Sequence, residues 1–337
     1  MSDDRITAAH GAGGKASAAL ISEVFIEAFG RVDETELADS ALLDVNGGRI
    51  AFTTDSYVVN PIRFPGGSIG DLAVNGTVND LAVCGARPLF LSAAFVIAEG
   101  MKLDDLRAVV ADMKAAAGRA GVRIVTGDTK VVPRDAGDQV YITTSGIGVV
   151  PPERTLGAGR VRAGDRLVIS GPIAGHGMAV MIARGNLNLT APIASDSAPV
   201  NGLVEALYAA LPPSGLRWMR DATRGGLGTI VNELAGATQL GVMLDDDAIP
   251  VEPCVRGACD MLGIDPLYVA NEGCFVAVVA EDCAEAAVEA LRESGAPQAG
   301  VIGEVVADLP GVVGCRNAFG GTRLVDTLVG DPLPRIC

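Results

Sequence analysis

The residue at the carboxyl end of the chain, Cys337, has a side chain that can do chemistry. The residues Pro-Arg-Ile at 334–336 precede it, and Pro332 stands just before them. A chain end is mobile unless it is docked, and prolines favour an extended backbone over a helix. Because thiolates are good nucleophiles and group carriers, we expect residues 326–337 to form a mobile arm that carries a reactive thiol. A terminal cysteine without any function also fits this segment taken alone.

Four aspartates share one kind of context: each lies at or near the end of a predicted regular element, beside glycine, threonine or asparagine. They are Asp55, Asp80, Asp128 and Asp221. Carboxylates that converge from separate elements repel one another unless a hard cation lies between them, and Mg²⁺ is the usual cation when phosphate is present. Aspartate at a helix cap is common, so no single position is specific. The set of four predicts a magnesium site.

Two glycine-rich segments could hold an anion. Residues 10–14 read His-Gly-Ala-Gly-Gly, and backbone N–H groups in such a loop can wrap a phosphate, although a flexible leader fits these residues equally well. Residues 221–226 read Asp-Ala-Thr-Arg-Gly-Gly, in which Arg224 can pair with phosphate oxygens and Gly225 permits close backbone approach at a helix start. The alternative is a plain helix cap with a surface arginine. Trp218 just ahead favours partial burial, and therefore a site.

A polar stripe runs along the predicted helix of residues 69–84. Asp71, Asn75 and Asn79 recur every four residues and share a face, with Asp80 beside them. A solvated face usually carries lysine and glutamate instead. The short side chains favour a binding site, and we expect this stripe to contact a nucleotide.

Three further side chains are candidates for catalysis. Lys130 follows Asp128 by two residues, so on an extended backbone both point to the same side, where the lysine could offset phosphate charge. Glu272 lies between an asparagine and a glycine just before a strand of buried type, where a carboxylate could act as a general base. His10 could contact phosphate or substrate. The alternatives are an exposed strand-end lysine, a turn glutamate and an exposed leader histidine.

Length and composition bound the class of protein. A chain of 337 residues, 49% of them apolar, predicts two domains with real cores. The net charge of −15 argues against nucleic acid or an anionic membrane as partner. Without a signal-peptide core or a run of bilayer length, we expect a cytoplasmic protein. Seven cysteines without CxxC spacing, far from the two histidines, argue against a disulfide framework or a zinc site.

The elements that must position these residues alternate irregularly between helix and strand in both halves, which predicts an α+β class rather than a doubly wound sheet. An amphipathic helix at 103–119 should place Leu106, Val109, Val110, Met113 and Ala117 on one face, and Gly121 should end it. Two prolines at 151–152 and glycines at 157–164 indicate a linker. Further expected helices cover 17–29, 198–211, 226–236 and 283–294, and expected strands cover 50–54, 89–97, 122–126, 140–150, 166–170, 274–280, 300–306 and 322–324.

Together these motifs resemble the PurM-like ATP-binding superfamily of AIR synthetase, selenophosphate synthetase and thiamine-monophosphate kinase, and most closely its HypE family of hydrogenase maturation proteins. The resemblance runs almost end to end. It includes residues 10–14, 53–58, 75–80, 127–132, 221–226 and 271–273 and the Pro-Arg-Ile-Cys tail. The tail distinguishes the HypE family from the rest of the superfamily, because thiamine-monophosphate kinase and AIR synthetase lack a carrier thiol at this position. Selenophosphate synthetase carries its reactive residue near the amino end, where this chain has none.

The resemblance implies a two-domain PurM-like fold: an ATP-binding domain at 1–155, ferredoxin-like and paired into a β-barrel across a homodimer, an α+β domain at 156–325, and the arm at 326–337. ATP would bind between the domains. The implied activity is ATP-dependent dehydration of an S-carbamoyl group on Cys337 to an S-cyano group, which becomes a cyanide ligand of [NiFe]-hydrogenase iron. The implied partners are the carbamoyltransferase HypF and the HypC–HypD scaffold, with ATP and Mg²⁺ as cofactors.

The resulting assignment of roles is as follows. The expected catalytic residues are Cys337, Glu272, Lys130 and His10; the nucleotide-binding residues are Gly11, Gly13, Gly14, Asp71, Asn75, Asn79, Thr129, Arg224 and Gly225; the metal ligands are Asp55, Asp80, Asp128 and Asp221. Two alternatives stay open: a PurM-type kinase or ligase acting on a free small molecule, and a nucleotide-binding scaffold without catalysis. Selenide chemistry would need a reactive thiol or selenol near residue 15, which this chain lacks.

Overall fold

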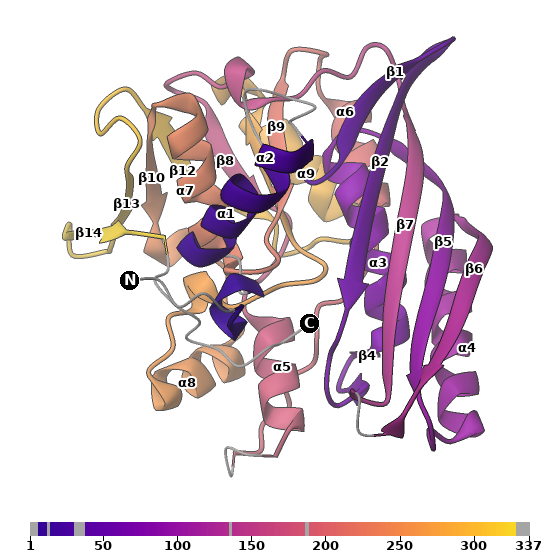
Figure 1. Cartoon of the computed structure of the whole chain (residues 1–337). Helices are drawn as coiled ribbons and strands as arrows, with labels where there is room; N and C mark the ends of the chain where they lie inside the picture. The colour runs from indigo at the N-terminus through magenta and orange to yellow at the C-terminus, as the bar shows by residue number, and fades with distance from the viewer. Residues whose placement is uncertain (1–5, 12–13, 30–37, 135–136, 186–188, 328–337) are drawn as a thin grey trace.

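A computed structural model describes residues 6–11, 14–29, 38–134, 137–185 and 189–327, arranged around two large β-sheets (Figure 1). The expected arm with Cys337, from residue 328 onward, and Gly13 lie outside these ranges. The first half of the chain builds one sheet and the second half builds the other. No helix in these ranges is both long and apolar enough to cross a bilayer.

The first sheet has five strands in the order β1-β2-β7-β5-β6 and is open, with β1 and β6 at its edges. The strands are β1 (Ala41–Val45), β2 (Gly48–Tyr57), β5 (Arg87–Ala98), β6 (Arg123–Val132) and β7 (Val140–Val150). Only β5 and β6 are parallel among these neighbours; the others are antiparallel. The strand expected at 140–150 is confirmed. The dimeric barrel stays a prediction, because a single open sheet does not test it.

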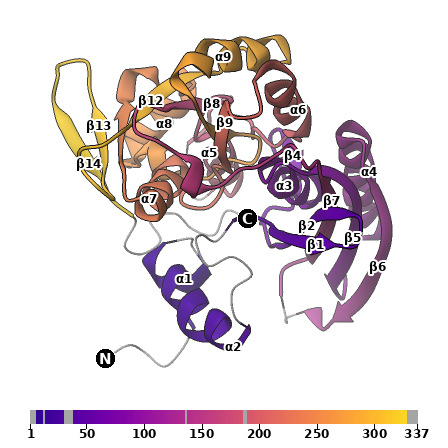
Figure 2. The same cartoon turned by 90° about the horizontal axis from the view of Figure 1, so that it is seen from above.

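Helices α3 (Ile69–Val83) and α4 (Leu103–Ala120) cover this sheet (Figure 2). A capping box starts α3: the Ser68 hydroxyl accepts from the Asp71 N–H while the Asp71 carboxylate accepts from the Ser68 N–H. The left-handed Gly121 ends α4, as expected. The expected apolar face of α4 is wrong at Val110, which is 46% exposed, since Ala116 and Ala120 complete the buried face instead. Small residues escape notice in a hydrophobic pattern.

The second sheet has seven strands in the order β14-β13-β10-β12-β8-β11-β9, mostly antiparallel, with β10 and β13 parallel. They are β8 (Arg166–Ile169), β9 (Leu216–Asp221), β10 (Gly241–Asp245), β11 (Phe275–Val279), β12 (Gly300–Val306), β13 (Val313–Arg316) and β14 (Thr322–Val325). The sequence did not indicate β1, β9, β10 or β13. Charged residues interrupt β9, which hid it from a hydrophobic pattern.

Both faces of the second sheet are covered, which explains the uninterrupted apolar run of β11. The helices are α5 (Gly175–Ala183), α6 (Asn201–Ala210), α7 (Gly226–Thr238), α8 (Pro253–Leu262) and α9 (Ala284–Glu293). Val276 and Val278 of β11 share a core with Leu227 and Val231 of α7. The alternate residues, Phe275 among them, belong to the core that contains α6 and α9. A strand buried on both sides needs apolar residues at every position.

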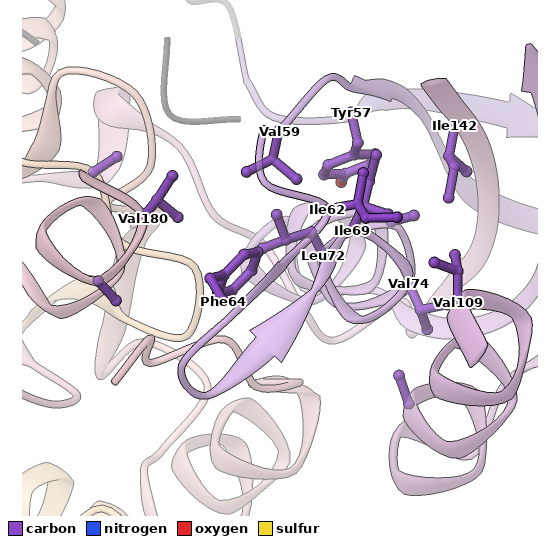
Figure 3. Packing of buried hydrophobic residues seen from close by; sticks show 14 of the residues in the cluster. Tyr57, Val59, Ile62, Phe64, Ile69, Leu72, Val74, Val109, Ile142 and Val180 are labelled. Atoms are coloured by element: carbon purple, nitrogen blue, oxygen red, sulfur yellow. The ribbon is translucent and has the colours of Figure 1, made fainter. Parts of the chain in front are cut away.

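One apolar cluster joins the two halves of the molecule. It includes Phe64, Ile69 and Leu72 from the first half and Met178 and Val180 of α5 from the second. Figure 3 shows Phe64 and Leu72 on the side of the cluster that faces Val180. The short strands β3 (Arg63–Phe64) and β4 (Gly67–Ser68) hold Phe64 in place. This shared core fixes the two halves against each other, and with them any site built between them.

Two expected features differ from the structure. The helix expected at 17–29 exists as a continuous helical segment of α1 (Lys15–Leu20), the π-helical η2 (Ile21–Ile26) and α2 (Glu27–Phe29), but its expected core face is open, with Phe25 48% exposed. Figure 2 shows this segment standing out from both sheets. The strand expected at 122–126 continues as β6 to Val132, so Asp128 and Lys130 lie inside a strand and not in a loop after it.

The central place of α3 predicts a large effect for one leucine. Leu72→Ala removes a fully buried side chain and should lower the free energy of unfolding by about 2–5 kcal/mol, because the cavity left behind loses its packing contacts. Leu103→Ala, on the 59% exposed leucine that opens α4, should change it by less than about 1 kcal/mol. Urea denaturation followed by circular dichroism measures both. Equal losses in the two variants would contradict this account of the core.

Candidate active site

Carboxylates from both halves of the chain meet where the halves join. Asp55 lies on β2 and Asp80 near the end of α3, both in the first half. From the second half, Asp221 ends β9 and Glu272 lies in the loop before β11. Burial raises the pKa of Asp80 well above its usual range, and the charges of Asp55 and Asp221 raise it further. The structure thus brings three of the four expected metal ligands together with the expected base.

Neighbouring hydroxyl groups orient these carboxylates. Thr53 donates to Asp80 Oδ2 at 2.7 Å, and Tyr57 donates to Asp55 Oδ2 at 3.2 Å. Thr223 donates to Asp221 Oδ1 at 3.4 Å. Hydroxyl donors relieve little of a full negative charge, and the pKa of Asp221 is still raised well above its usual range by burial and then by Asp39 and Asp55. The cluster therefore carries more negative charge than its protein neighbours neutralise.

Asp39 belongs to this cluster, although sequence reasoning missed it. Arg220 donates to Asp39 Oδ1 at 2.9 Å, while Asp39 Oδ2 is buried without a hydrogen-bond partner. Burial raises the pKa of Asp39 to about 6, against the lowering effect of Arg220. No periodic pattern marks this residue, because it stands in an irregular segment just ahead of β1. Its proximity arises only from the folding of that segment.

Glu272 is almost fully buried, at 4% exposed, and burial raises its pKa well above the usual range. The charges of Asp221, Asp196 and Asp55 raise it further, and Arg224 opposes them. A glutamate with high proton affinity in a carboxylate-lined site suits general base chemistry. The structure is thus compatible with the expected role.

The glycine-rich turn after Asp221 starts α7 with two left-handed residues. Gly225 has φ +76° and Gly226 has φ +61°, and a Cβ at Gly226 would lie 2.5 Å from the Leu267 carbonyl oxygen. Only glycine fits this turn. Arg224 is exposed, and its Nη1 donates to the Gly11 carbonyl at 3.4 Å, so the two glycine-rich segments lie side by side. This places a guanidinium and a helix start next to the carboxylates, an arrangement that can hold phosphate.

The amino-terminal loop is only partly described. His10 is half-buried, and its Nδ1 lies 2.9 Å from the Thr7 hydroxyl. Gly14 precedes α1 as its N-cap. Gly11 and Gly14 thus flank the start of α1 near Arg224, while the expected contacts of His10 with a substrate stay a prediction.

Asp128, Thr129 and Lys130 do not join the cluster. The register of the first sheet shows their separation. Asp55 of β2 pairs with Thr144 of β7, which pairs with Ala93 of β5. The next residue of β5, Ala94, pairs with Asp128 of β6. Three strand spacings separate Asp128 from Asp55, which amounts to about 14 Å. Lys130 Nζ lies 2.6 Å from the Asp128 carboxylate on the exposed edge strand, and this bond lowers the pKa of Asp128.

The polar stripe of α3 holds other parts of the protein. Asp71 serves the capping box and pairs with Arg119 at 3.0 Å, and it lies nine residues from Asp80, about 14 Å along the helix. Asn75 donates to the Ser197 hydroxyl at 3.0 Å, and Asn79 donates to the carbonyls of Ala198 and Glu272. Asn75 and Asn79 are therefore buried between the halves and bind protein groups there, while the expected contact of the stripe with a nucleotide stays a prediction.

Within the described ranges, no group of three or more His, Cys, Asp or Glu side chains is arranged to hold a metal ion by itself. The raised pKa values nevertheless show an excess of buried negative charge, and Asp39 Oδ2 lacks a partner. Mg²⁺ commonly binds through one or two carboxylates and completes its coordination with substrate phosphates and water. The residues therefore fit a magnesium ion that arrives with a nucleotide, not a preformed metal cage.

Comparison with known protein families agrees with this architecture. The model "AIR synthase related protein, N-terminal domain" matches residues 37–150, and "AIR synthase related protein, C-terminal domain" matches residues 162–315. The fold and the site therefore define a two-domain PurM-like protein of the AIR synthase related class. A thiamine-monophosphate kinase solved with AMPPCP and TMP has the same fold, with a TM-score of 0.67 at 14% identity.

Closer relatives narrow the class. The chain is 52% identical to the carbamoyl dehydratase HypE of Rhodobacter capsulatus, over 100% of this chain and 99% of that protein. It is 43% identical to the HypE of Escherichia coli K12, over 99% of this chain and 100% of that protein. A HypE solved with ATP has a TM-score of 0.81 to this chain at 45% identity, covering 97% of this chain and 98% of that one. The HypE of a HypE–HypF complex has a TM-score of 0.86 at 44% identity, covering 92% of this chain and 100% of that one. The chain belongs to the carbamoyl dehydratase HypE family.

The uncompensated charge of the cluster predicts an unusual gain in stability. Asp80→Asn removes a charge whose pKa is raised in the folded state. Such a group binds protons more tightly when the protein is folded, so it costs stability as pH rises above the ordinary carboxyl range. Without divalent cations at pH 8, Asp80→Asn should be more stable than the parent chain, by about 1 kcal/mol per pKa unit relieved.

Urea denaturation in EDTA at pH 6, 7 and 8 measures this effect, and the gap between the two proteins should widen with pH. Asp247→Asn, on an exposed aspartate, is the matched control and should show no such trend. A variant less stable than the parent at pH 8 would show that the charge of Asp80 is already neutralised by protein groups.

Proposed function

We propose that this protein is an ATP-dependent carbamoyl dehydratase, which converts an S-carbamoyl group on Cys337 into S-cyanocysteine and supplies cyanide for [NiFe]-hydrogenase maturation. The observation that carries the proposal is its similarity, over nearly the full length of both chains, to relatives named carbamoyl dehydratase HypE. The buried carboxylate cluster with Glu272 at its edge is the site at which the chemistry would occur.

The reaction removes the oxygen of an amide, which is a poor leaving group. The thiocarbamate oxygen attacks the γ-phosphorus of ATP, and ADP leaves. The C–O bond then breaks, so that the oxygen departs within inorganic phosphate, while both N–H protons are lost and the carbon–nitrogen bond becomes triple. ATP supplies the driving force, and nothing is oxidised or reduced. This sequence needs phosphate stabilisation and one well-placed base.

The residues of the cluster divide this work. Glu272 accepts a proton from the amide nitrogen as phosphate departs. Arg224 and the left-handed turn at Gly225 hold phosphate oxygens. Asp55, Asp80 and Asp221 would hold Mg²⁺, with Asp39 as an additional candidate, and the ion would supply positive charge that offsets the charge of the phosphate groups. The roles of His10, Gly11, Gly13, Gly14, Asp71, Asn75 and Asn79 stay predictions, with Asp71 the least favoured by its position.

The partners follow from the chemistry and the surface. One relative was solved in a HypE–HypF complex, and we propose that a HypF-type carbamoyltransferase loads Cys337 and that a HypC–HypD scaffold receives the cyanide in the cytoplasm.

We also propose a homodimer. Strand β6 is an edge strand with Val125 and Val131 exposed, and such an edge pairs readily with another strand. Asp128, Thr129 and Lys130 would then be interface residues.

Intact mass spectrometry tests the dehydratase directly. The protein, a HypF-type carbamoyltransferase, carbamoyl phosphate and Mg-ATP should give a carbamoyl adduct on Cys337 that loses one water. Cys337→Ala should accept no adduct and yield no cyanide, yet bind ATP with unchanged affinity. Cyanide formation by Cys337→Ala would favour the alternative, an enzyme that acts on a free small molecule.

The dimer has its own prediction. Val131→Lys puts a charge on a 68% exposed position of the edge strand and should shift the protein from dimer toward monomer, because a charged edge resists strand pairing. Met261→Lys, on a 75% exposed methionine of α8, should leave the mass unchanged. Analytical ultracentrifugation measures both. A dimer of undiminished stability in Val131→Lys would exclude β6 as the interface.

A further inference from the structure

An irregular segment of residues 193–200 passes between the two halves of the molecule, and we call it the crossing segment. The Ser195 N–H donates to the Pro65 carbonyl at 2.8 Å. The Ser197 hydroxyl accepts from Asn75, and the Val200 N–H donates to Asn79 Oδ1 at 2.8 Å. These bonds fasten a segment of the second half to the first half. The position of the crossing segment therefore depends on the contact between the two halves.

Asp196 lies in the middle of this segment and holds the backbone of the Glu272 loop. The N–H of Glu272 lies 3.2 and 3.1 Å from the two carboxylate oxygens of Asp196, and the N–H of Gly273 donates to Oδ2 at 3.0 Å. Asp196 also accepts from the backbone N–H of His176. One carboxylate thus receives four backbone donors, its own N–H included, and two of them come from the loop that carries the base.

The other sides of the loop are fixed as well. Asn79 donates to the Glu272 carbonyl at 3.2 Å, and Asn271 donates to the Ala222 carbonyl at 2.7 Å, next to Asp221. A Cβ on Gly273 would lie 1.9 Å from the Asp196 carbonyl oxygen, so only glycine permits this approach. Asp196 and Asn79 bind the backbone of Glu272 and not its side chain, which leaves the carboxylate for chemistry.

Accepting these N–H groups with a buried carboxylate lowers the stability of the folded protein, because a charge is costly to bury. A serine or asparagine could accept from a backbone donor without adding charge. Asp196 instead adds negative charge near Glu272, and this charge contributes to the raised pKa of Glu272. A purely structural contact would not need that cost in stability. The charge is useful if it keeps the proton affinity of a base high and its loop in one position.

We propose that Asp196 is a positioning residue for Glu272, and that it links the crossing segment, and so the contact between the two halves, to the placement of the catalytic base. The proposal rests on the proposed function, in which Glu272 removes the amide proton. It concerns the dehydration step alone. Loading of Cys337 and affinity for ATP do not depend on it.

A double-mutant cycle tests the proposal with the full-length carbamoylated protein. Single-turnover dehydration is followed by intact mass at increasing Mg-ATP for the parent, Asp196→Asn, Glu272→Gln and the double variant. Asp196→Asn keeps the shape of the side chain but replaces one acceptor oxygen with a donor group. We expect it to lower the maximal rate at least about tenfold while the KM for ATP changes less than about twofold. In the Glu272→Gln background the same change should have no further effect.

Asp165→Asn is the matched control. Asp165 is another buried aspartate, and it accepts a hydrogen bond from the Arg162 N–H at 2.8 Å. It lies just before Arg166, the first residue of β8, which pairs with Val279 at the end of β11 farthest from the Glu272 loop. It should lower the melting temperature without changing the dehydration rate. If Asp196→Asn does not fold, the cycle is repeated with Asp196→Ser, which keeps one acceptor and removes the charge.

The outcomes distinguish failure of the positioning role of Asp196 from failure of the base role of Glu272. If Asp196→Asn slows the parent and the Glu272→Gln background by the same factor, or slows neither, Asp196 does not act through Glu272 and the positioning role is overturned. If Glu272→Gln alone dehydrates at the full rate, the base role and the positioning role both fail, while the dehydratase activity itself stands. Loss of ATP affinity in Asp196→Asn would also overturn the proposal, because it assigns Asp196 no part in binding.

Discussion

Mutual repulsion among buried carboxylates is the constraint on which this structure depends. Asp80, Asp221 and Glu272 are held together at the junction of the two halves, and burial and neighbouring charge raise the pKa of each. Arg220 offsets part of this charge through Asp39, and hydroxyl groups orient the rest. Arg220 also lowers the pKa of Asp221 and Arg224 lowers that of Glu272, yet both pKa values stay raised. A site of this kind is completed by what it binds, here a magnesium nucleotide.

Such a cluster persists only because stronger forces close the molecule around it. The apolar cluster shared by Phe64, Leu72 and α5 buries surface from both halves, at about 25 cal/mol for each Å² removed from water. Asn75 and Asn79 add hydrogen bonds from α3 to the crossing segment. The stability of the interdomain core therefore offsets the cost of the site. The same contacts set the distance between the carboxylates of the first half and Glu272 of the second.

Much of this could be predicted from the sequence, for physical reasons. The helices at α3 and α4 and the strands at β7 and β12 carry strong periodic or β-branched patterns. The short polar side chains of α3 set its stripe apart from a solvated face, and Asn75 and Asn79 are buried. Asp55, Asp80, Asp221 and Glu272 were identified as site residues by their neighbours, and the structure brings them together. The strands β9 and β13 were missed because charged or small residues break their hydrophobic pattern, and β10 was missed because its apolar run is only three residues long. Asp39 was missed because its proximity arises from an irregular segment. Asp128 and Lys130 were placed with the cluster because sequence spacing does not tell which edge of a sheet a strand occupies.

The proton balance of nucleotide binding tests the central claim most directly. Isothermal titration calorimetry of Mg-ATP into the protein at pH 7, in two buffers of different ionisation enthalpy, counts the protons exchanged. We expect net proton release, since a cation entering the cluster lowers the raised pKa values of Asp80, Asp221 and Glu272 and drives their protons off. Equal heats in the two buffers, or proton uptake, would show that the nucleotide's cation does not bind among these carboxylates.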